Sequence, residues 1–248
     1  MSSIHTKNSS LKSKSRFNEM FGDPLNNNKK FAVKTGQQCF KFSSGKFLDK
    51  HDRVFEGYPA YGGNGIAWKS RKYLIDNPTI IIGRVGAYCG NVRTTHGKVW
   101  ISDNAIYIKE FKNSDFNLVF LLELMKVIDF SKFADFSGQP KITQKPLENQ
   151  KYILPPLALQ NEFADFVALV DKSQFIIHVL RNNNYSRVIS GSAQPQLPIT
   201  KLKKILLPLP PLALQNEFAD FVVQVDKSEF ACEIAIKVWR NSLKFSII

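Results

Sequence analysis

Residues 154–175 read LPPLALQNEFADFVALVDKSQF, and residues 209–230 read LPPLALQNEFADFVVQVDKSEF. The two stretches are identical at 19 of 22 positions and lie 55 residues apart. Identity of this length is not expected from two unrelated helices that share only a hydrophobic pattern, so it indicates a duplication within the gene. One unit therefore occurs twice, and the remaining sequence is arranged around it.

Each copy begins with a proline pair and continues with the spacing of an amphipathic helix. A helix of roughly 30 residues spans about 45 Å, which is long for an element of one compact core. We therefore predict two long amphipathic helices that pack as an antiparallel, coiled-coil-like pair or against a partner. The alternative is two ordinary helices of one globular domain. The residues predicted at this interface are Leu159, Phe163, Phe166, Val170, Leu214, Phe218, Phe221 and Val225.

The region before the first copy has a different pattern. Short β-branched and aromatic segments alternate with Gly, Asn and Asp over residues 54–109, which predicts strands joined by tight turns. Residues 79–82 and 105–108 are the strand candidates, and residues 118–129 (LVFLLELMKVID) predict a helix. The fold class predicted for the chain is α+β, with one mixed α/β domain followed by the two long helices.

Positive charge is concentrated in the first part of the chain. The formal net charge is +13; residues 1–100 hold 17 Lys and Arg against 6 Asp and Glu, and residues 101–248 hold 17 against 15. A one-sided positive surface attracts polyanions, so nucleic acid is the leading candidate partner, with a merely basic protein as the alternative. No apolar run is long enough to span a membrane or to act as a secretory signal, and the three cysteines form no CxxC pair, so we expect a cytoplasmic protein.

Several kinds of catalytic site lack their sequence signals. The chain has neither a glycine-rich dinucleotide or nucleotide loop nor the Asn-Pro-Pro-Tyr type of tetrapeptide that adenine methyltransferases use. Its four histidines are scattered without metal-ligand spacing. A nuclease would have to use Asp76, Asp103, Lys109 and Glu110, which are spaced as turn and strand-end residues. We therefore predict no catalytic residue, no metal site and no cofactor on this chain.

Residues suited to DNA recognition gather in the basic region. Basic side chains bind phosphates, whereas guanidinium, amide and aromatic groups read base edges and faces. Glycines between them allow the backbone to approach a groove closely. The alternative is that the aromatic residues belong to the core and the basic ones to a solvated rim. The predicted DNA-binding residues are Tyr61, Asn64, Lys69, Arg71, Lys72, Arg84, Tyr88, Arg93, Gln139, Lys141 and Thr143.

Five segments in a fixed order resemble the DNA-specificity subunit of type I restriction-modification systems. They are YPAYGGNGIAW (58–68), IIIGRVGAYCGNV (80–92), VWISDNAIYI (99–108), FSGQPKIT (136–143) and ILPPLALQNEFADFV (153–167). The resemblance implies a protein that reads one half of a bipartite DNA target with each recognition domain and docks modification subunits on its helices. It also implies that S-adenosylmethionine, ATP and Mg²⁺ act on the modification and restriction subunits.

The resemblance divides the chain into five segments. Residues 1–22 are the tail of a conserved helix or a junction, 23–153 the target-recognition domain, 154–189 the first conserved helix, 190–209 a remnant of a second recognition domain or a linker, and 210–248 the second conserved helix.

The chain departs from the family pattern in its second half. Only about 20 residues stand where a second recognition domain is expected, and the first conserved helix is expected to lack its partner upstream of residue 15. We therefore expect a truncated or half-length subunit. It acts either as a half-subunit that forms a homodimer and reads a palindromic interrupted target, or as a deletion product that serves as an assembly or decoy protein.

Overall fold

A computed structural model describes residues 3–182 and Pro211. The chain divides into two compact units, residues 14–165 and residues 1–13 with 166–248. The predicted second conserved helix, with Leu214, Phe218, Phe221 and Val225, lies outside the described residues. Within the described part, no helix is both long and apolar enough to cross a membrane.

Helices and strands are interspersed along the described part of the chain. The α-helices are α1 (Ser3–Phe21), α2 (Gly36–Cys39), α3 (Leu118–Ile128), α4 (Gln144–Asn149) and α5 (Leu157–Asn182). Short 3₁₀ turns cover Lys50–Asp52, Gly86–Tyr88 and Phe130–Phe133.

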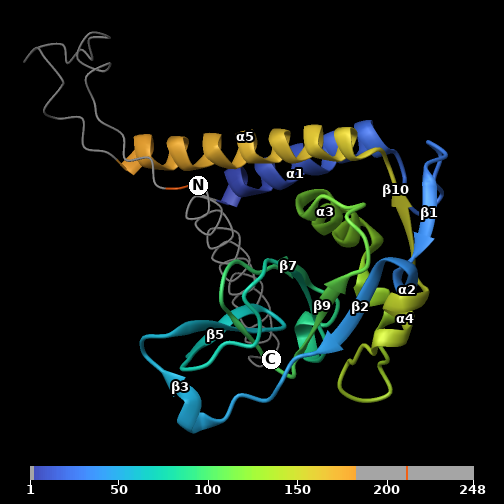
Figure 1. Ribbon diagram of the computed structural model, residues 1–248. Coiled ribbons are helices and arrows are strands. Elements are labelled where there is room, and N and C mark those ends of the chain that lie inside the picture. Colours follow the sequence, from blue (N-terminus) through green and yellow to red (C-terminus); the bar gives the residue numbers. More distant parts are fainter. Residues whose placement is uncertain (1–2, 183–210, 212–248) are drawn as a thin grey trace, which may run out of the picture. The chain divides into compact units, whose positions relative to one another are not determined.

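The strands of the described residues form three sheets (Figure 1). The large sheet has the order β2 (Phe40–Ser44), β9 (Ala105–Phe111), β6 (Ile80–Gly83) and β7 (Val92–Thr94). The small sheet has the order β3 (Arg53–Val54), β5 (Gly65–Ser70), β4 (Tyr58–Gly62) and β8 (Trp100–Ile101). A two-stranded sheet pairs β1 (Ala32–Thr35) with β10 (Lys151–Leu154). The mixed α+β fold predicted for this region is confirmed.

The predicted strands and helix lie where the sequence pattern placed them. All four residues of β6 are buried, as expected of an apolar run in a central strand. The helix α3 begins after Asn117, whose Oδ1 accepts the backbone N–H of Val119 at 2.9 Å, and it ends at Asp129 in the left-handed conformation (φ 58°). These caps explain why the helix covers residues 118–128.

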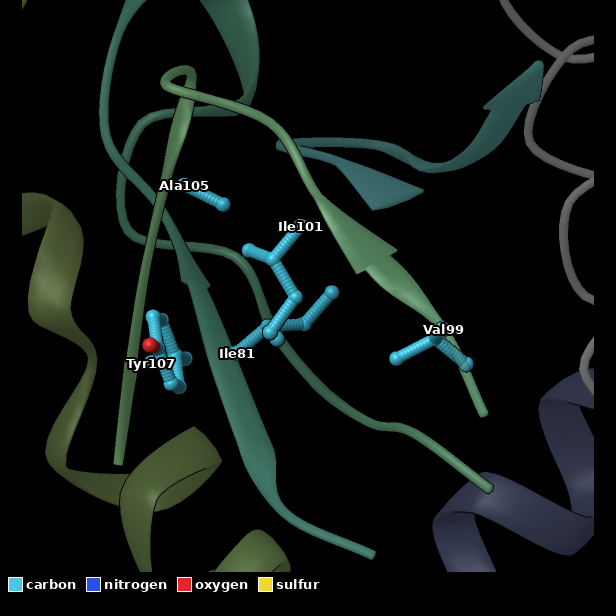
Figure 2. Packing of buried hydrophobic residues seen from close by; sticks show 5 residues of the cluster. All are labelled: Ile81, Val99, Ile101, Ala105 and Tyr107. Carbon is cyan, nitrogen blue, oxygen red and sulfur yellow. The ribbon is translucent and has the colours of Figure 1, made fainter. Parts of the chain in front are cut away.

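One buried cluster joins the two four-stranded sheets (Figure 2). Ile81 of β6 and Tyr107 of β9 come from the large sheet, and Ile101 comes from the small sheet. Val99 and Ala105 complete the cluster, and Val99 and Ile101 are fully buried. Because the sheets share this core, the turns at their junction are held in fixed positions.

The start of α5 is packed differently from the sequence-based expectation. Phe163 is predicted to face the other long helix or a partner subunit, but it packs against the end of α1. The Phe163 ring is fully buried, with its centroid 5.5 Å from Phe17 and 5.6 Å from Phe21. Sequence reasoning missed this contact because only the tail of a conserved helix was expected there, and no local pattern pairs residues 146 positions apart. Leu159, Phe166 and Val170 are half-buried.

Candidate nucleic-acid interface

Four segments meet at the junction of the two sheets. They are the β4–β5 turn, the loop after β6, the turn at residues 102–104 and the loop before α4. Arg84 N–H donates to the Asn104 carbonyl at 2.8 Å, and Ile142 N–H donates to the Arg84 carbonyl at 2.9 Å. Gly86 N–H donates to the Pro140 carbonyl at 2.9 Å. Backbone hydrogen bonds therefore fix these loops to one another.

Glycines make this close approach possible. A Cβ on Gly63 would lie 3.3 Å from both the Asn104 carbonyl oxygen and the Gly83 Cα. A Cβ on Gly83 would collide with the Tyr88 carbonyl oxygen. Gly86 has φ +77°, a conformation that side-chain-bearing residues rarely adopt. The glycines noted in the sequence thus serve first to bring the loops together.

Polar and aromatic side chains surround this glycine junction, and we name them the turn cluster. Tyr88 is 47% exposed, whereas Arg84 is half-buried and its Nη1 donates to the Asp103 carbonyl at 3.3 Å. That hydrogen bond holds the guanidinium beside the 102–104 turn. The members of the turn cluster are Tyr61, Asn64, Arg84, Tyr88, Gln139 and Lys141.

A tight turn orders the segment that carries Gln139 and Lys141. Asp135 and Lys141 exchange two backbone hydrogen bonds, at 2.9 and 3.1 Å. The Asp135 carboxylate accepts the Ser137 backbone N–H at 2.9 Å, and this bond is the main reason why the pKa of Asp135 is lowered. The loop is therefore closed by its own backbone and by an ionised carboxylate.

The second group of predicted residues lies at the far end of the β4–β5 hairpin, and we name it the hairpin patch. Lys72 Nζ lies 3.1 Å from Asp52 Oδ2, while Lys69 and Arg71 are exposed. Trp68 is 54% exposed, with the Arg53 guanidinium 4.6 Å from its ring centroid. The structure therefore separates Lys69, Arg71 and Lys72 from the turn cluster.

Two predicted residues belong to neither group. Arg93 lies on the edge strand β7, opposite Ile81, and is half-buried. Thr143 precedes α4 as its N-cap residue, is exposed and makes no side-chain capping hydrogen bond. Their positions give no reason to place them with the other predicted DNA-binding residues.

Sequence reasoning passed over several exposed residues near the hairpin patch. Phe55 is fully exposed, and Phe47 is 66% exposed. Lys98 Nζ lies 4.9 Å from the ring centroid of Tyr73. A signal for Phe55 was available, because an aromatic residue followed directly by Glu56 and Gly57 is expected in a turn, where it has no strand partner to pack against.

The nuclease candidates do not form a metal site. Lys109 and Glu110 are neighbours on β9, where successive side chains point to opposite faces, and both are exposed. Among the residues that the structure describes, no group of three or more His, Cys, Asp or Glu is placed to hold a metal ion. Cys89 is buried, which raises the pKa of its thiol, and its Sγ donates to the Arg84 carbonyl at 3.3 Å. Cys89 therefore supports the loop after β6.

The chain belongs to the family described as the type I restriction modification DNA specificity domain. The family model matches residues 28–178 and 168–237. This membership confirms the predicted class, a specificity subunit rather than an enzyme.

A relative and two solved structures agree with this class. The specificity subunit of the type I restriction enzyme EcoprrI from Escherichia coli is 26% identical over 174 residues, covering 68% of this chain and 42% of that protein. The type I restriction-modification S subunit from M. genitalium has a TM-score of 0.53 at 17% identity, covering 64% of this chain and 44% of that one. The HsdS subunit from Thermoanaerobacter tengcongensis has a TM-score of 0.51 at 14% identity, covering 91% and 52%. The chain thus spans about half the length of these relatives.

Proposed function

We propose that the chain binds double-stranded DNA sequence-specifically through the turn cluster and reads one half of a bipartite target. The observation that carries this proposal is the glycine-rich junction of the two sheets. Guanidinium, amide, phenol and ammonium groups from separate loops surround it. These groups suit the donor and acceptor pattern of base edges in the major groove. Backbone hydrogen bonds hold the loops before DNA arrives, which reduces the entropy lost on binding.

The two groups of residues have different roles in this proposal. Arg84, Asn64 and Gln139 contact base edges, since guanidinium and amide groups can form two hydrogen bonds to a single base. Lys141 and the hairpin patch contact phosphates, which set position and affinity without reading sequence. The surplus of 11 positive charges in residues 1–100, 17 against 6, supports the second role.

The proposal includes partners and a cellular location. The conserved helices dock modification subunits, and the restriction subunit joins in the full complex. This chain needs no cofactor of its own, because S-adenosylmethionine, ATP and Mg²⁺ act on the partner subunits in the cytoplasm. Two copies of the chain would restore two recognition domains related by a two-fold axis.

DNA binding is tested by fluorescence anisotropy with site-bearing and random duplexes across a range of salt concentrations, with and without the modification subunit. We expect Arg84→Ala to reduce the preference for the site by about 10-fold or more. Lys141→Ala should weaken binding to all duplexes alike and lower the salt slope by about one. Lys126→Ala, on α3 and paired with Glu123 at 2.6 Å, is the control. Binding without salt dependence or without site preference contradicts the proposal.

Methylome sequencing with and without the gene tests the role in the cell. A bipartite methylated motif should appear only when the gene is present, and a palindromic motif would support two copies per complex. Co-purification with the modification subunit but unchanged methylation would favour the assembly or decoy role instead.

A further inference from the structure

The β4–β5 turn carries the one Asn-Gly pair of the sequence. Asn64 is exposed at the end of this turn, and Gly65 follows it as the first residue of β5. Gly65 has φ +113°, a conformation that favours glycine, and it has no Cβ that would shield its backbone nitrogen from the preceding side chain. An amide side chain directly before an unshielded backbone nitrogen is the arrangement in which asparagine reacts with its own chain.

This reaction needs only water. The backbone nitrogen of Gly65 attacks Cγ of Asn64, the bond between Cγ and Nδ2 breaks, and ammonia leaves with the former amide hydrogen of Gly65. Water then opens the resulting succinimide ring at one of its carbonyl groups, which gives either aspartate or isoaspartate at position 64. One water molecule is consumed and one ammonia molecule is released, so no oxidant, reductant or cofactor takes part.

A second exposed asparagine at the same junction lacks this arrangement. Asn104, in the turn at residues 102–104, is followed by Ala105, which is fully buried. The N–H of Ala105 donates to the Ser102 carbonyl at 3.1 Å. The nitrogen after Asn104 is therefore shielded by a Cβ and held in a hydrogen bond, so Asn104 is a matched comparison within the same molecule.

We propose that Asn64 is a site of spontaneous deamidation, and that this modification removes DNA reading from the chain as the protein ages. The modification follows from the β4–β5 turn alone. Its effect on DNA rests on the proposed function of the turn cluster.

Aspartate at position 64 changes the charge of the turn cluster. The side chain of Asn64 offers hydrogen-bond donors and an acceptor, whereas a carboxylate only accepts. Near neutral pH this carboxylate is ionised, which adds a negative charge to the cluster that contains Arg84 and Lys141. The new charge repels DNA phosphates, and the donors that suit base acceptors are lost.

Isoaspartate changes the shape of the turn as well. It continues the chain through its side chain, which adds one carbon to the backbone between Gly63 and Gly65. The surroundings leave little room for this, because a Cβ on Gly63 would lie 3.3 Å from both the Asn104 carbonyl oxygen and the Gly83 Cα. The lengthened turn must therefore move away from the loops that it contacts.

The modification is tested by incubating the full-length chain at mildly alkaline pH in water labelled with heavy oxygen. Digestion with trypsin in ordinary water then yields residues 54–69 and residues 99–109, each of which contains a single asparagine and no glutamine. Mass spectrometry counts only deamidation that occurred before digestion, because only that product carries the label. We expect label in residues 54–69 to accumulate about 10-fold faster or more than in residues 99–109, since Gly65 lacks the Cβ that shields the next nitrogen.

The effect on DNA is tested by fluorescence anisotropy with a site-bearing duplex. Asn64→Asp should bind about 10-fold or more weakly than the unaltered chain. Its melting temperature should be unchanged, because position 64 is exposed. The aged, unaltered chain should lose site-specific binding in proportion to the labelled fraction of residues 54–69.

Asn64→Gln is the matched control, because its longer side chain would have to form a larger and less favourable ring. It should take up no label in residues 54–69, and its DNA affinity, whatever its starting value, should not decline with age. A decline equal to that of the unaltered chain would assign the loss to other sites and overturn the proposal.

Two further results would overturn the proposal. The first is label that accumulates at Asn64 no faster than at Asn104. The second is full site-specific binding by Asn64→Asp when Arg84→Ala has lost its site preference, which would leave the proposed function standing. If the unaltered chain shows no site preference at all, the proposed function fails, and with it the effect of ageing on DNA reading, whereas the label still decides whether Asn64 is modified.

Discussion

The two four-stranded sheets differ in how far the side chains of their inner strands are buried. In the large sheet every residue of β6 is buried. In the small sheet the four inner residues of β5, Ile66–Lys69, are all exposed, and only Gly65 and Ser70 at the strand ends are buried. Backbone pairing is similar in both, since β6 and β5 are each hydrogen-bonded on both sides.

This difference indicates at which positions the side chain can change without disturbing the core. The side chains of β6 are fully used in packing, so changing them changes the core. Side chains of β5 and of the turns beside it are held in place by backbone contacts and remain available to a partner. A rigid scaffold with variable exposed positions suits a protein whose task is to distinguish DNA sequences.

The largest effect is expected from the core of the large sheet. Ile82→Ala removes a fully buried side chain and should lower the free energy of unfolding by about 2–5 kcal/mol. Urea denaturation measures this change, and DNA affinity of the folded fraction should stay the same. A loss below about 1 kcal/mol would show that the large sheet is not the scaffold we describe.

A smaller effect is expected at the junction between the sheets. Gly83→Ala places a Cβ against the Tyr88 carbonyl and should cost about 1–3 kcal/mol of stability. It should also weaken site-specific DNA binding, because the loop that carries Arg84 must move. Gly138→Ala is the matched control, since a Cβ there meets nothing within 4 Å. Equal behaviour of the two variants in melting and anisotropy would remove the argument for a glycine-dependent junction.

A substitution in the exposed strand β5 should change DNA affinity more than stability, which is the reverse of the effect expected for a core substitution. Trp68→Ala removes the ring beneath Arg53 and should change stability by at most about 1 kcal/mol. We expect its DNA affinity to fall several-fold, with Trp68→Phe retaining part of it, as titration by anisotropy would show. A large stability loss without any change in affinity would mean that Trp68 contributes to packing and not to DNA binding.

The smallest effect at neutral pH is expected in the two-stranded sheet, outside both larger sheets. Burial raises the pKa of the Tyr152 phenol well above its usual value, and the nearby Cys39 adds to this shift. Because the unfolded chain loses this proton first, the contribution of Tyr152 to stability should be constant below about pH 10 and should fall as the pH rises beyond it.

Tyr152→Phe tests the origin of this alkaline loss. Its only described hydrogen bond, from Oη to the Leu147 carbonyl, is long at 3.4 Å, so the variant should lose less than about 1 kcal/mol at pH 7. Its melting temperature should fall less than that of the unaltered chain between pH 9 and 11. An unchanged alkaline decline would assign the effect to other groups.

Local patterns predicted the elements that depend on local chemistry. The isoleucine run at 80–82 and the apolar stretch at 118–129 made β6 and α3 predictable, because burial patterns are read from neighbouring residues. The contact between Phe17 and Phe163 was missed, because it joins residues far apart in the chain. The grouping of Arg84 with Gln139 was equally out of reach, since loop backbones meet there and no spacing encodes it.

The amino-acid sequence is sufficient to establish the family, the α+β class, the absence of the usual catalytic signatures and the repetition of residues 154–175 at 209–230. These properties rest on the order and identity of residues, which need no coordinates. The tertiary structure was needed to show which predicted DNA-binding residues share a surface, and that Phe17 and Phe21 of α1 pack against Phe163. Both results depend on long-range packing. The sequence alone does not show which distant residues will be in contact once the core has formed.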